Sequence, residues 1–387
     1  MKKAILIILM MAALFSCKSP AEQKAEIQAL AFENLQSQID SLFNQNIDAN
    51  GPGAALLVSY EGEMLIGNGY GLRDLETNAP ITPATNMRMA SVSKQFTNLC
   101  ILTLVDQGKL ALTDSLYHFW TYPVFKDITV QQLIDHTSGI ADYDAAFMED
   151  WDRSKIVENR DVLDWLATDP PPLFQAGTKW EYSNTAYLVL ALLVEKVSGQ
   201  EFSAYAKKQV FDKAGMSRTN FYNLAKPIDI PERANCYEKD SLGAWSKVDG
   251  FFMNGIMGDG AVYSSLNDYF EYDRALRNKT IVSKASHELI FKPTSMVLPE
   301  TAKYPFPFLK GADERYAMGW FVTDDFALHS GSWYGTRTMV VRDMGRPLTL
   351  AIFLNSDDAD ARTKLIEGTY SLVDDYLMAL ARLLPLE

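Results

Sequence analysis

The chain has 387 residues with a formal net charge of −13, and 48% of the residues are hydrophobic. This is enough apolar material for a sizeable core, in one large domain or two small ones. An acidic chain without a basic cluster argues against a nucleic-acid partner and gives no attraction to anionic lipid. The four histidines are scattered, with no His-Glu-x-x-His motif and no paired cysteines, so we expect no metal and no cofactor.

The first residues have the pattern of an export signal. Lys2 and Lys3 precede an apolar run over residues 4–15, which is too short to span a bilayer as a mature helix. The residues just before Cys17 resemble a bacterial lipoprotein cleavage box. We therefore expect a signal peptide over residues 1–16 and a lipid anchor on Cys17 in the bacterial cell envelope, at the outer membrane facing the periplasm or the exterior. An ordinary secretory signal, with Cys17 incidental, is the alternative.

The segment after the signal divides into a tether and the start of a domain. Residues 17–30 are polar and rich in alanine, as expected for a tether, and residues 31–387 are expected to form a single domain. Apolar residues at helical spacing predict a helix over about 31–43. Two apolar stretches over 54–60 and 64–70, separated by a turn, predict a β-hairpin.

The middle of the chain has a mainly helical pattern, and strands return only near the end. The predicted helices of the middle cover 91–107, 129–136, 160–167, 184–198, 201–210 and 265–277. The late elements are strands at 317–323, 336–342 and 348–354 and a last helix over about 361–383.

Strands at both ends around a helical middle favour an α+β fold. We expect one sheet lobe built from about 31–90 and 315–387, with a mainly helical lobe of about 91–314 inserted. Hairpins imply mostly antiparallel pairing, and the terminal helices would cover one face of the sheet. Cys100 lies in an apolar run and is expected to be a buried free thiol, while a disulfide with Cys236 stays open.

The most informative motif is Ser91-Val92-Ser93-Lys94, the only Ser-x-x-Lys in the chain. A three-residue step on a helix brings both side chains to one face. A hydroxyl beside an amine is one way to activate a serine nucleophile without histidine. A serine at a helix N-terminus can also use free N–H groups to stabilise developing negative charge.

Two further motifs follow in order. Tyr182-Ser183-Asn184 is the only Tyr-x-Asn and precedes an apolar helix, and His329-Ser330-Gly331 ends a short strand. With these three motifs the chain resembles the serine β-lactamase and penicillin-binding-protein superfamily, in the branch of class C β-lactamases, D-stereospecific peptidases and esterases. Other matching stretches are Leu133–Gly139, Gly258–Ala261 and Tyr316–Trp320. The resemblance implies a β-lactamase/transpeptidase-like fold and a serine hydrolase that works through an acyl-enzyme.

The residue types suggest a role for each position. Ser91 is the expected nucleophile, and Lys94 must be neutral to accept its proton, which requires its pKa to fall by about three units from about 10.4. The resemblance makes Tyr182 the second candidate base and the Ser332 N–H the second oxyanion donor beside that of Ser91. Asn184 can both accept and donate, so orienting the acyl side chain is its natural role.

The third motif departs from the β-lactamase pattern, which usually has lysine where this chain has His329. A histidine there would be mostly neutral at pH 7, so we expect weak or absent β-lactamase activity. Gly331 would let the substrate backbone approach the strand, and Trp333 is expected to line the acyl pocket, although it could as easily be core. His136 suits a structural cap better than a catalytic role.

We therefore expect an exported serine hydrolase whose partner is a small-molecule or peptide substrate. The candidate substrates are D-amino-acid peptides, peptidoglycan-derived peptides and carboxylic esters. The alternative is a non-catalytic binding or sensor lipoprotein for cell-wall fragments, against which the intact Ser91, Lys94 and Tyr182 argue.

Overall fold

The computed structural model describes residues 19–294 and 296–383. The chain divides into two compact units, residues 47–363 and a second unit formed by the segments up to 46 and from 364. The sequence predicted a single domain over 31–387, and this division into two units does not test that prediction. The expected signal peptide and Cys17 lie outside the described residues. No helix within the described ranges has the length and apolar character needed to cross a membrane.

The smaller unit contains α2 (Pro20–Asn46) and most of α11 (Ala359–Leu383). The Phe32 and Tyr376 rings of the two helices lie 6.1 Å apart between centroids. α2 starts earlier than the sequence predicted, because Ser19 and Glu22 exchange capping hydrogen bonds and the Ala/Glu/Gln-rich residues that follow favour a helix. The part of the expected tether from residue 20 onward is therefore helical.

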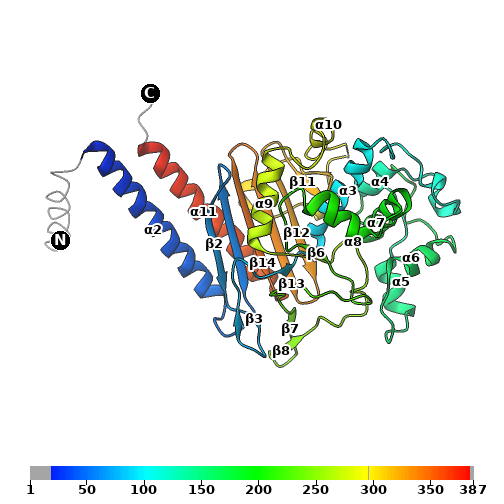
Figure 1. Ribbon diagram of the computed structural model, residues 1–387, viewed down its shortest axis with the longest axis horizontal. Coiled ribbons are helices and arrows are strands. Elements are labelled where there is room, and N and C mark those ends of the chain that lie inside the picture. Colours follow the sequence, from blue (N-terminus) through cyan, green and yellow to red (C-terminus); the bar gives the residue numbers. More distant parts are fainter. Residues whose placement is uncertain (1–18, 295, 384–387) are drawn as a thin grey trace. The chain divides into compact units, whose positions relative to one another are not determined.

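The larger unit is built on a seven-stranded antiparallel sheet (Figure 1). In spatial order its strands are β10 (Arg315–Ala317), β11 (Trp320–Val322), β12 (Phe326–Trp333), β13 (Thr336–Asp343), β14 (Leu348–Leu354), β1 (Ala54–Tyr60) and β2 (Glu63–Tyr70). β1 pairs with β14 along its whole length, so an early and a late segment of the chain share one sheet. The α+β class and the antiparallel sheet from both ends of the chain are confirmed.

The strand predicted over 317–323 is instead a tight hairpin, with β10 and β11 on either side of Met318 and Gly319. Both turn residues have positive φ, 43° and 85°. A Cβ on Gly319 would lie 2.7 Å from the backbone nitrogen of Gln95, so the turn packs directly against the start of the helix α3 (Lys94–Asp106). The sequence predicted only the end of β12, which is a full eight-residue strand.

The inserted segment is mainly helical, as predicted, and its helices α3 to α8 gather to one side of the sheet (Figure 1). The helices are α3 (Lys94–Asp106), α4 (Val130–Ile134), α5 (Tyr143–Asp150), α6 (Asn159–Leu166), α7 (Asn184–Ser198), α8 (Phe202–Ala206), α9 (Leu266–Arg277) and α10 (Lys284–His287). Short strands accompany them: β3 (Leu72–Asp74) with β4 (Ala79–Pro80), β5 (Met87–Arg88) and β6 (Asn220–Phe221) on either side of β9 (Val262–Ser264), and β7 (Tyr237–Lys239) with β8 (Trp245–Lys247). Of the described helices of this segment, α5 and the short α10 were not predicted.

A buried ion-pair network fixes α9 to the sheet. Asp273 of α9 pairs with Arg342 of β13 and with Arg277, and accepts a hydrogen bond from Ser59 of β1 at 3.0 Å. Burial alone would raise the pKa of Asp273, but the two guanidinium groups hold it below its usual value.

The two cysteines of the described residues form no disulfide. Cys100 and Cys236 are both buried free thiols, so the disulfide left open by the sequence does not form.

Candidate active site

Ser91 lies in a 3-10 turn, Ala90–Ser93, that leads directly into α3. The expected helix N-terminus is therefore preceded by one tighter turn. Ala90 has a φ of +44°, a left-handed conformation that costs a non-glycine residue about 1–3 kcal/mol. Such strain immediately before a serine is typical of a side chain held in a fixed position for chemistry.

Lys94 is fully buried, and its Nζ faces three oxygens. It donates to the Asp259 carbonyl at 2.7 Å and to Asn184 Oδ1 at 2.8 Å, and the Ser91 Oγ lies at 3.4 Å. The two closer oxygens can only accept, so a neutral amine uses both of its N–H groups there. Its lone pair is then directed at the Ser91 hydroxyl, as a general base requires.

The protonation of Lys94 is balanced by its surroundings. Burial lowers the pKa of Lys94 to about 8, while the charges of Asp259 and Asp144 act in the opposite direction. At pH 7 about one tenth of the molecules therefore carry the neutral amine. The fall in the pKa of Lys94 is somewhat smaller than the three units expected from the sequence, because the Asp259 and Asp144 carboxylates lie close to its amine.

Tyr182 and Asn184 lie at the N-terminus of α7. The Ser183 hydroxyl caps this helix by accepting from the Ala186 N–H at 3.1 Å. His136 accepts a hydrogen bond from the Ser183 N–H through Nδ1 at 3.0 Å, and its ring lies 4.3 Å from that of Tyr182. His136 therefore has a structural role, because its hydrogen bond holds the segment that carries Tyr182 and Asn184.

The Tyr182 hydroxyl is buried and makes no hydrogen bond of normal geometry within the described residues. Burial raises the pKa of Tyr182 well above its ordinary value, although the nearby Ser91 hydroxyl opposes this rise. The Lys94 Nζ lies 4.8 Å from the centre of the tyrosine ring. A phenol that keeps its proton can donate to a leaving group, which favours Lys94 as the base and Tyr182 as the acid.

Asn184 has both ends of its side-chain amide engaged. Besides accepting from Lys94, it donates through Nδ2 to Asp144 Oδ2 at 2.7 Å. Burial, followed by the charge of Asp259, raises the pKa of Asp144 to about 6. Asn184 therefore positions Lys94, and its expected contact with the substrate stays a prediction.

The third motif lies on the part of β12 that β11 leaves uncovered, since β11 pairs with β12 only as far as Leu328. On this open edge the Ser330 N–H donates to the Tyr304 hydroxyl at 2.8 Å. N–H groups two residues apart in a strand point to the same edge, so the Ser332 N–H also points away from β13. Ser332 lines the same pocket as Ser91, as a second oxyanion donor would.

Gly331 is needed for packing between the first and third motifs. A Cβ there would lie 2.4 Å from the Met89 carbonyl oxygen and 2.2 Å from Thr338 Oγ1. The absent side chain allows the turn that carries Ser91 to approach β12. This close packing explains why the position requires glycine. The substrate contact that the sequence predicted for Gly331 is a separate role.

His329 is buried, with both ring nitrogens engaged. Nδ1 lies 2.6 Å from the Ser330 carbonyl, which can only accept, so Nδ1 carries the proton and Nε2 faces the Tyr316 hydroxyl at 3.0 Å. Burial, helped by the charge of Lys94, lowers the pKa of His329 to about 3. The side chain is neutral and lies outside the pocket lining, so its predicted contact with substrate stays a prediction.

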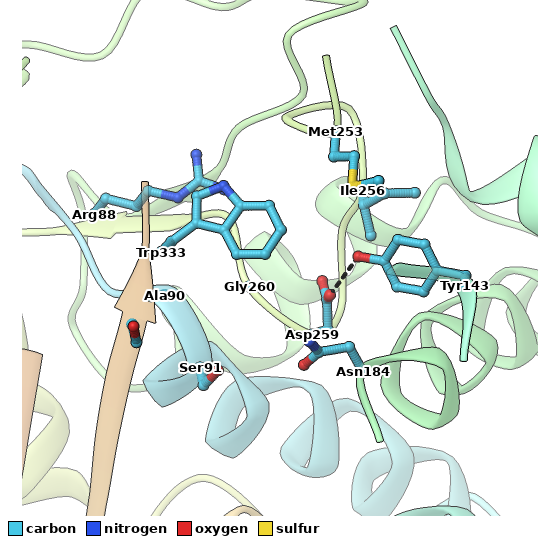
Figure 2. A pocket seen from close by; sticks show the side chains of 11 residues that line it. Arg88, Ala90, Ser91, Tyr143, Asn184, Met253, Ile256, Asp259, Gly260 and Trp333 are labelled. Carbon is cyan, nitrogen blue, oxygen red and sulfur yellow. Dashed lines mark hydrogen bonds between the residues drawn. The ribbon is translucent and has the colours of Figure 1, made fainter. Parts of the chain in front are cut away.

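A narrow pocket opens beside Ser91 (Figure 2). Trp333 lines it, as predicted, and its indole N–H donates to Asn254 at 2.8 Å. Across the pocket the Tyr143 hydroxyl donates to Asp259 at 2.9 Å (Figure 2). The complete lining is Arg88, Ala90, Ser91, Tyr143, Asn184, Met253, Ile256, Asp259, Gly260, Ser332 and Trp333.

Several residues in or next to this pocket were not predicted as site residues. Tyr143 and Asp144 belong to α5, whose N-cap Asp142 was the one available signal for that helix. Asp259 lies in a stretch that matched the superfamily but suggested no role. Arg88 stands three residues before Ser91 on β5, and its spacing carried no signal of its own.

Comparisons with known proteins agree with this geometry. A family model described as Beta-lactamase matches residues 39–368. Penicillin-binding protein 4* of Bacillus subtilis (strain 168) is 30% identical over 344 residues, covering 85% of this chain and 73% of the relative. Protein flp of Staphylococcus aureus (strain NCTC 8325 / PS 47) is 31% identical over 315 residues, covering 77% of this chain and 58% of the relative.

Solved structures show the same fold. A penicillin-binding protein from Bacillus halodurans has a TM-score of 0.74 at 21% identity, covering 86% of this chain and 98% of that one. The D-amino acid amidase from Ochrobactrum anthropi SV3 has a TM-score of 0.69 at 21% identity, covering 90% of this chain and 99% of that one. At these identities the likeness is one of fold alone, and it confirms the expected β-lactamase/transpeptidase-like fold. The family match and the Bacillus subtilis relative show that the chain belongs to the beta-lactamase family of penicillin-binding-protein-like serine hydrolases.

Proposed function

We propose that this protein hydrolyses an amide or ester through an acyl-enzyme on Ser91. The observation that carries the proposal is the arrangement around Lys94, whose two shortest contacts are to oxygens that can only accept. Among the described residues, the Ser91 hydroxyl is the one remaining polar contact of this amine, and it can donate to the lone pair. Its pKa of about 8 makes that neutral form accessible near physiological pH.

The reaction follows from the positions of these groups. Lys94 takes the Ser91 proton as Oγ attacks the substrate carbonyl, and the N–H groups of Ser91 and Ser332 stabilise the oxyanion. Tyr182 donates a proton to the departing amine or alcohol, which leaves the acyl-enzyme. A water then attacks the ester, with its proton taken up by the Lys94 and Tyr182 pair, and Ser91 is released.

We propose D-amino-acid peptides, peptidoglycan-derived peptides and carboxylic esters as the substrate classes. The name of the Bacillus subtilis relative, a penicillin-binding protein, supports the first two. The neutral, buried His329 supports weak or absent β-lactamase activity, because it offers no charge where β-lactamases usually place lysine. Turnover of a chromogenic cephalosporin at the rate of a dedicated β-lactamase would contradict this part of the proposal.

The nucleophile can be tested by intact-protein mass spectrometry with a panel of esters, D-peptides and β-lactams. Wild-type protein should gain the acyl mass and lose it again, whereas Ser91→Ala should stay unmodified. Ser93→Ala is the matched control, because Ser93 lies in the same turn but its hydroxyl accepts from the Val262 N–H. Acylation of Ser91→Ala at the wild-type rate would refute the role of Ser91, and binding of cell-wall fragments without any acylation would favour the non-catalytic alternative.

We also propose that the protein is exported and anchored through a lipid on Cys17, as its first residues suggest. The test is metabolic labelling with palmitate in a bacterial host. Wild-type protein should take up the label in the membrane fraction, and Cys17→Ala should not. Equal labelling of both proteins would overturn the anchor.

A further inference from the structure

Arg88 is a largely buried residue whose side chain has no hydrogen-bond or ion-pair partner among the described residues. Only 5% of the residue is exposed, and it makes no hydrogen bond and no ion pair with any residue in the described ranges. Its Nε is buried and unpartnered. Leaving a charged group unpaired in the interior is costly, so proteins rarely do so without a functional reason.

Arg342, the one other buried arginine among the described residues, has a carboxylate partner, and so has the half-buried Arg233. Arg342 pairs with Asp273, and Arg233 pairs with Asp249 at 3.0 Å. Arg233 is a close comparison, because its guanidinium lies 5.2 Å from the centre of the same Tyr263 ring that Arg88 approaches at 6.0 Å. The two arginines share an aromatic neighbour, and the one that lines the pocket is the one left unpaired.

Arg88 and Ser91 line the same pocket. Figure 2 shows the side chain running along the indole of Trp333, whose ring centre is 5.8 Å from the guanidinium carbon. Of the described residues that line the pocket, Arg88 alone carries a positive charge. The acidic member of the lining, Asp259, lies across the pocket and already accepts from the Tyr143 hydroxyl. Within the described ranges no carboxylate forms an ion pair with Arg88.

We propose that Arg88 binds a carboxylate on the acyl part of the substrate. A guanidinium offers a planar fork of N–H donors that matches the two oxygens of a carboxylate, and such a charge-assisted pair is stronger than a hydrogen bond between neutral groups. The acyl side is favoured because Tyr182, the proton donor to the leaving group, is not part of the pocket lining. The inference rests on the proposed function, and it narrows the substrate to acyl groups with a negatively charged end.

The test compares two esters of equal shape and different charge. One is the 4-nitrophenyl monoester of adipic acid, with a terminal carboxylate, and the other carries a terminal primary amide in its place. Release of nitrophenol is followed at low ionic strength and corrected for spontaneous hydrolysis. The measured quantity is the ratio of kcat/KM for the acid to kcat/KM for the amide.

Wild-type enzyme should prefer the acid, and Arg88→Met should lower the ratio by about 10–100-fold, the usual effect of losing a hydrogen bond to a charged group. Arg88→Lys keeps the charge without the fork and should lower the ratio less. Arg233→Gln, which removes the neighbouring paired arginine, should leave the ratio at its wild-type value.

The outcomes separate the two proposals. No turnover of either ester by wild-type enzyme overturns the proposed function. Turnover of both esters with no preference for the acid overturns the role of Arg88 alone, and this result needs no variant to fold. The role is also overturned if Arg88→Met keeps the wild-type ratio. A further pair, butyrate esters with a carboxylate or a carboxamide on the nitrophenol, tests the side of the scissile bond. An effect of Arg88→Met on this pair alone overturns the assignment to the acyl part.

Discussion

Replacing Asp144 by asparagine should move the pH dependence of acylation toward lower pH. Asp144 faces Lys94 through the amide of Asn184, with hydrogen bonds of 2.7 and 2.8 Å on the two sides. Its negative charge stabilises the protonated lysine and so raises the pKa of Lys94. Asparagine can still accept from Asn184, so the substitution removes the charge and keeps the hydrogen bond.

The size of the effect follows from the separation of the charges. Two hydrogen bonds and the amide between them put the charges roughly 6–7 Å apart, where Coulomb's law gives about 1.3–2.5 kcal/mol at an effective dielectric constant of about 20–40. Because Asp259 remains, we take the lower end, a fall of about one in the pKa of Lys94. Asp144, with a pKa of about 6, is ionised in the wild-type enzyme at pH 7 and above, so the comparison is between a charged and a neutral side chain.

The assay is kcat/KM for 4-nitrophenyl acetate between pH 5.5 and 9.5, which reports the free enzyme. The wild-type value should rise with a midpoint near pH 8, and Asp144→Asn should be up to about fivefold faster at pH 7 and unchanged at pH 9.5. Asp142→Asn is the matched control, because Asp142 is the exposed N-cap of the same helix and asparagine caps equally well. A wild-type profile flat through pH 8, or equal shifts in both variants, would refute the reasoning.

Three further substitutions test the site and the fold. Tyr182→Phe should lower kcat by about 10²–10⁴-fold with little change in stability, because the hydroxyl has no structural hydrogen bond of normal geometry within the described residues; steady-state kinetics and thermal unfolding measure the two effects. Gly331→Ala should destabilise the protein by about 1–3 kcal/mol and slow acylation, since the new Cβ collides with the Met89 carbonyl; wild-type stability in urea would contradict the packing argument. Asp273→Ala should cost about 3–5 kcal/mol, because it leaves Arg342 buried without its carboxylate, and a loss below about 1 kcal/mol in urea unfolding would contradict the importance of this pair.

The elements that could be predicted are those whose pattern is local. β1 and β14 are apolar stretches that match their predicted bounds to the residue, and α7 is an apolar run between a serine cap and a glycine. The hairpin of β10 and β11 could not be predicted, because its turn is set by close packing against α3 and not by its own residues.

The residues of the site likewise fall into those that a local sequence motif reveals and those that only the folded structure reveals. Ser91, Lys94, Tyr182 and Asn184 carry motifs and meet in space as expected. The importance of Arg88 rests on the absence of a partner, which is a property of the folded protein and leaves no pattern in the sequence.

The pairing of β1 with β14 determines when, during synthesis of the chain, the active site can form. Ala54 lies opposite Leu354, so the central ladder of the sheet cannot close until the chain is almost complete. The serine and its base are made early, but the strand that carries the oxyanion donor is fixed only when β13 and β14 are in register beside it. Pairings between such distant segments form slowly. We therefore expect a nascent chain to be chemically silent until its last strands have been translated, so that the hydrolase cannot act during its own synthesis.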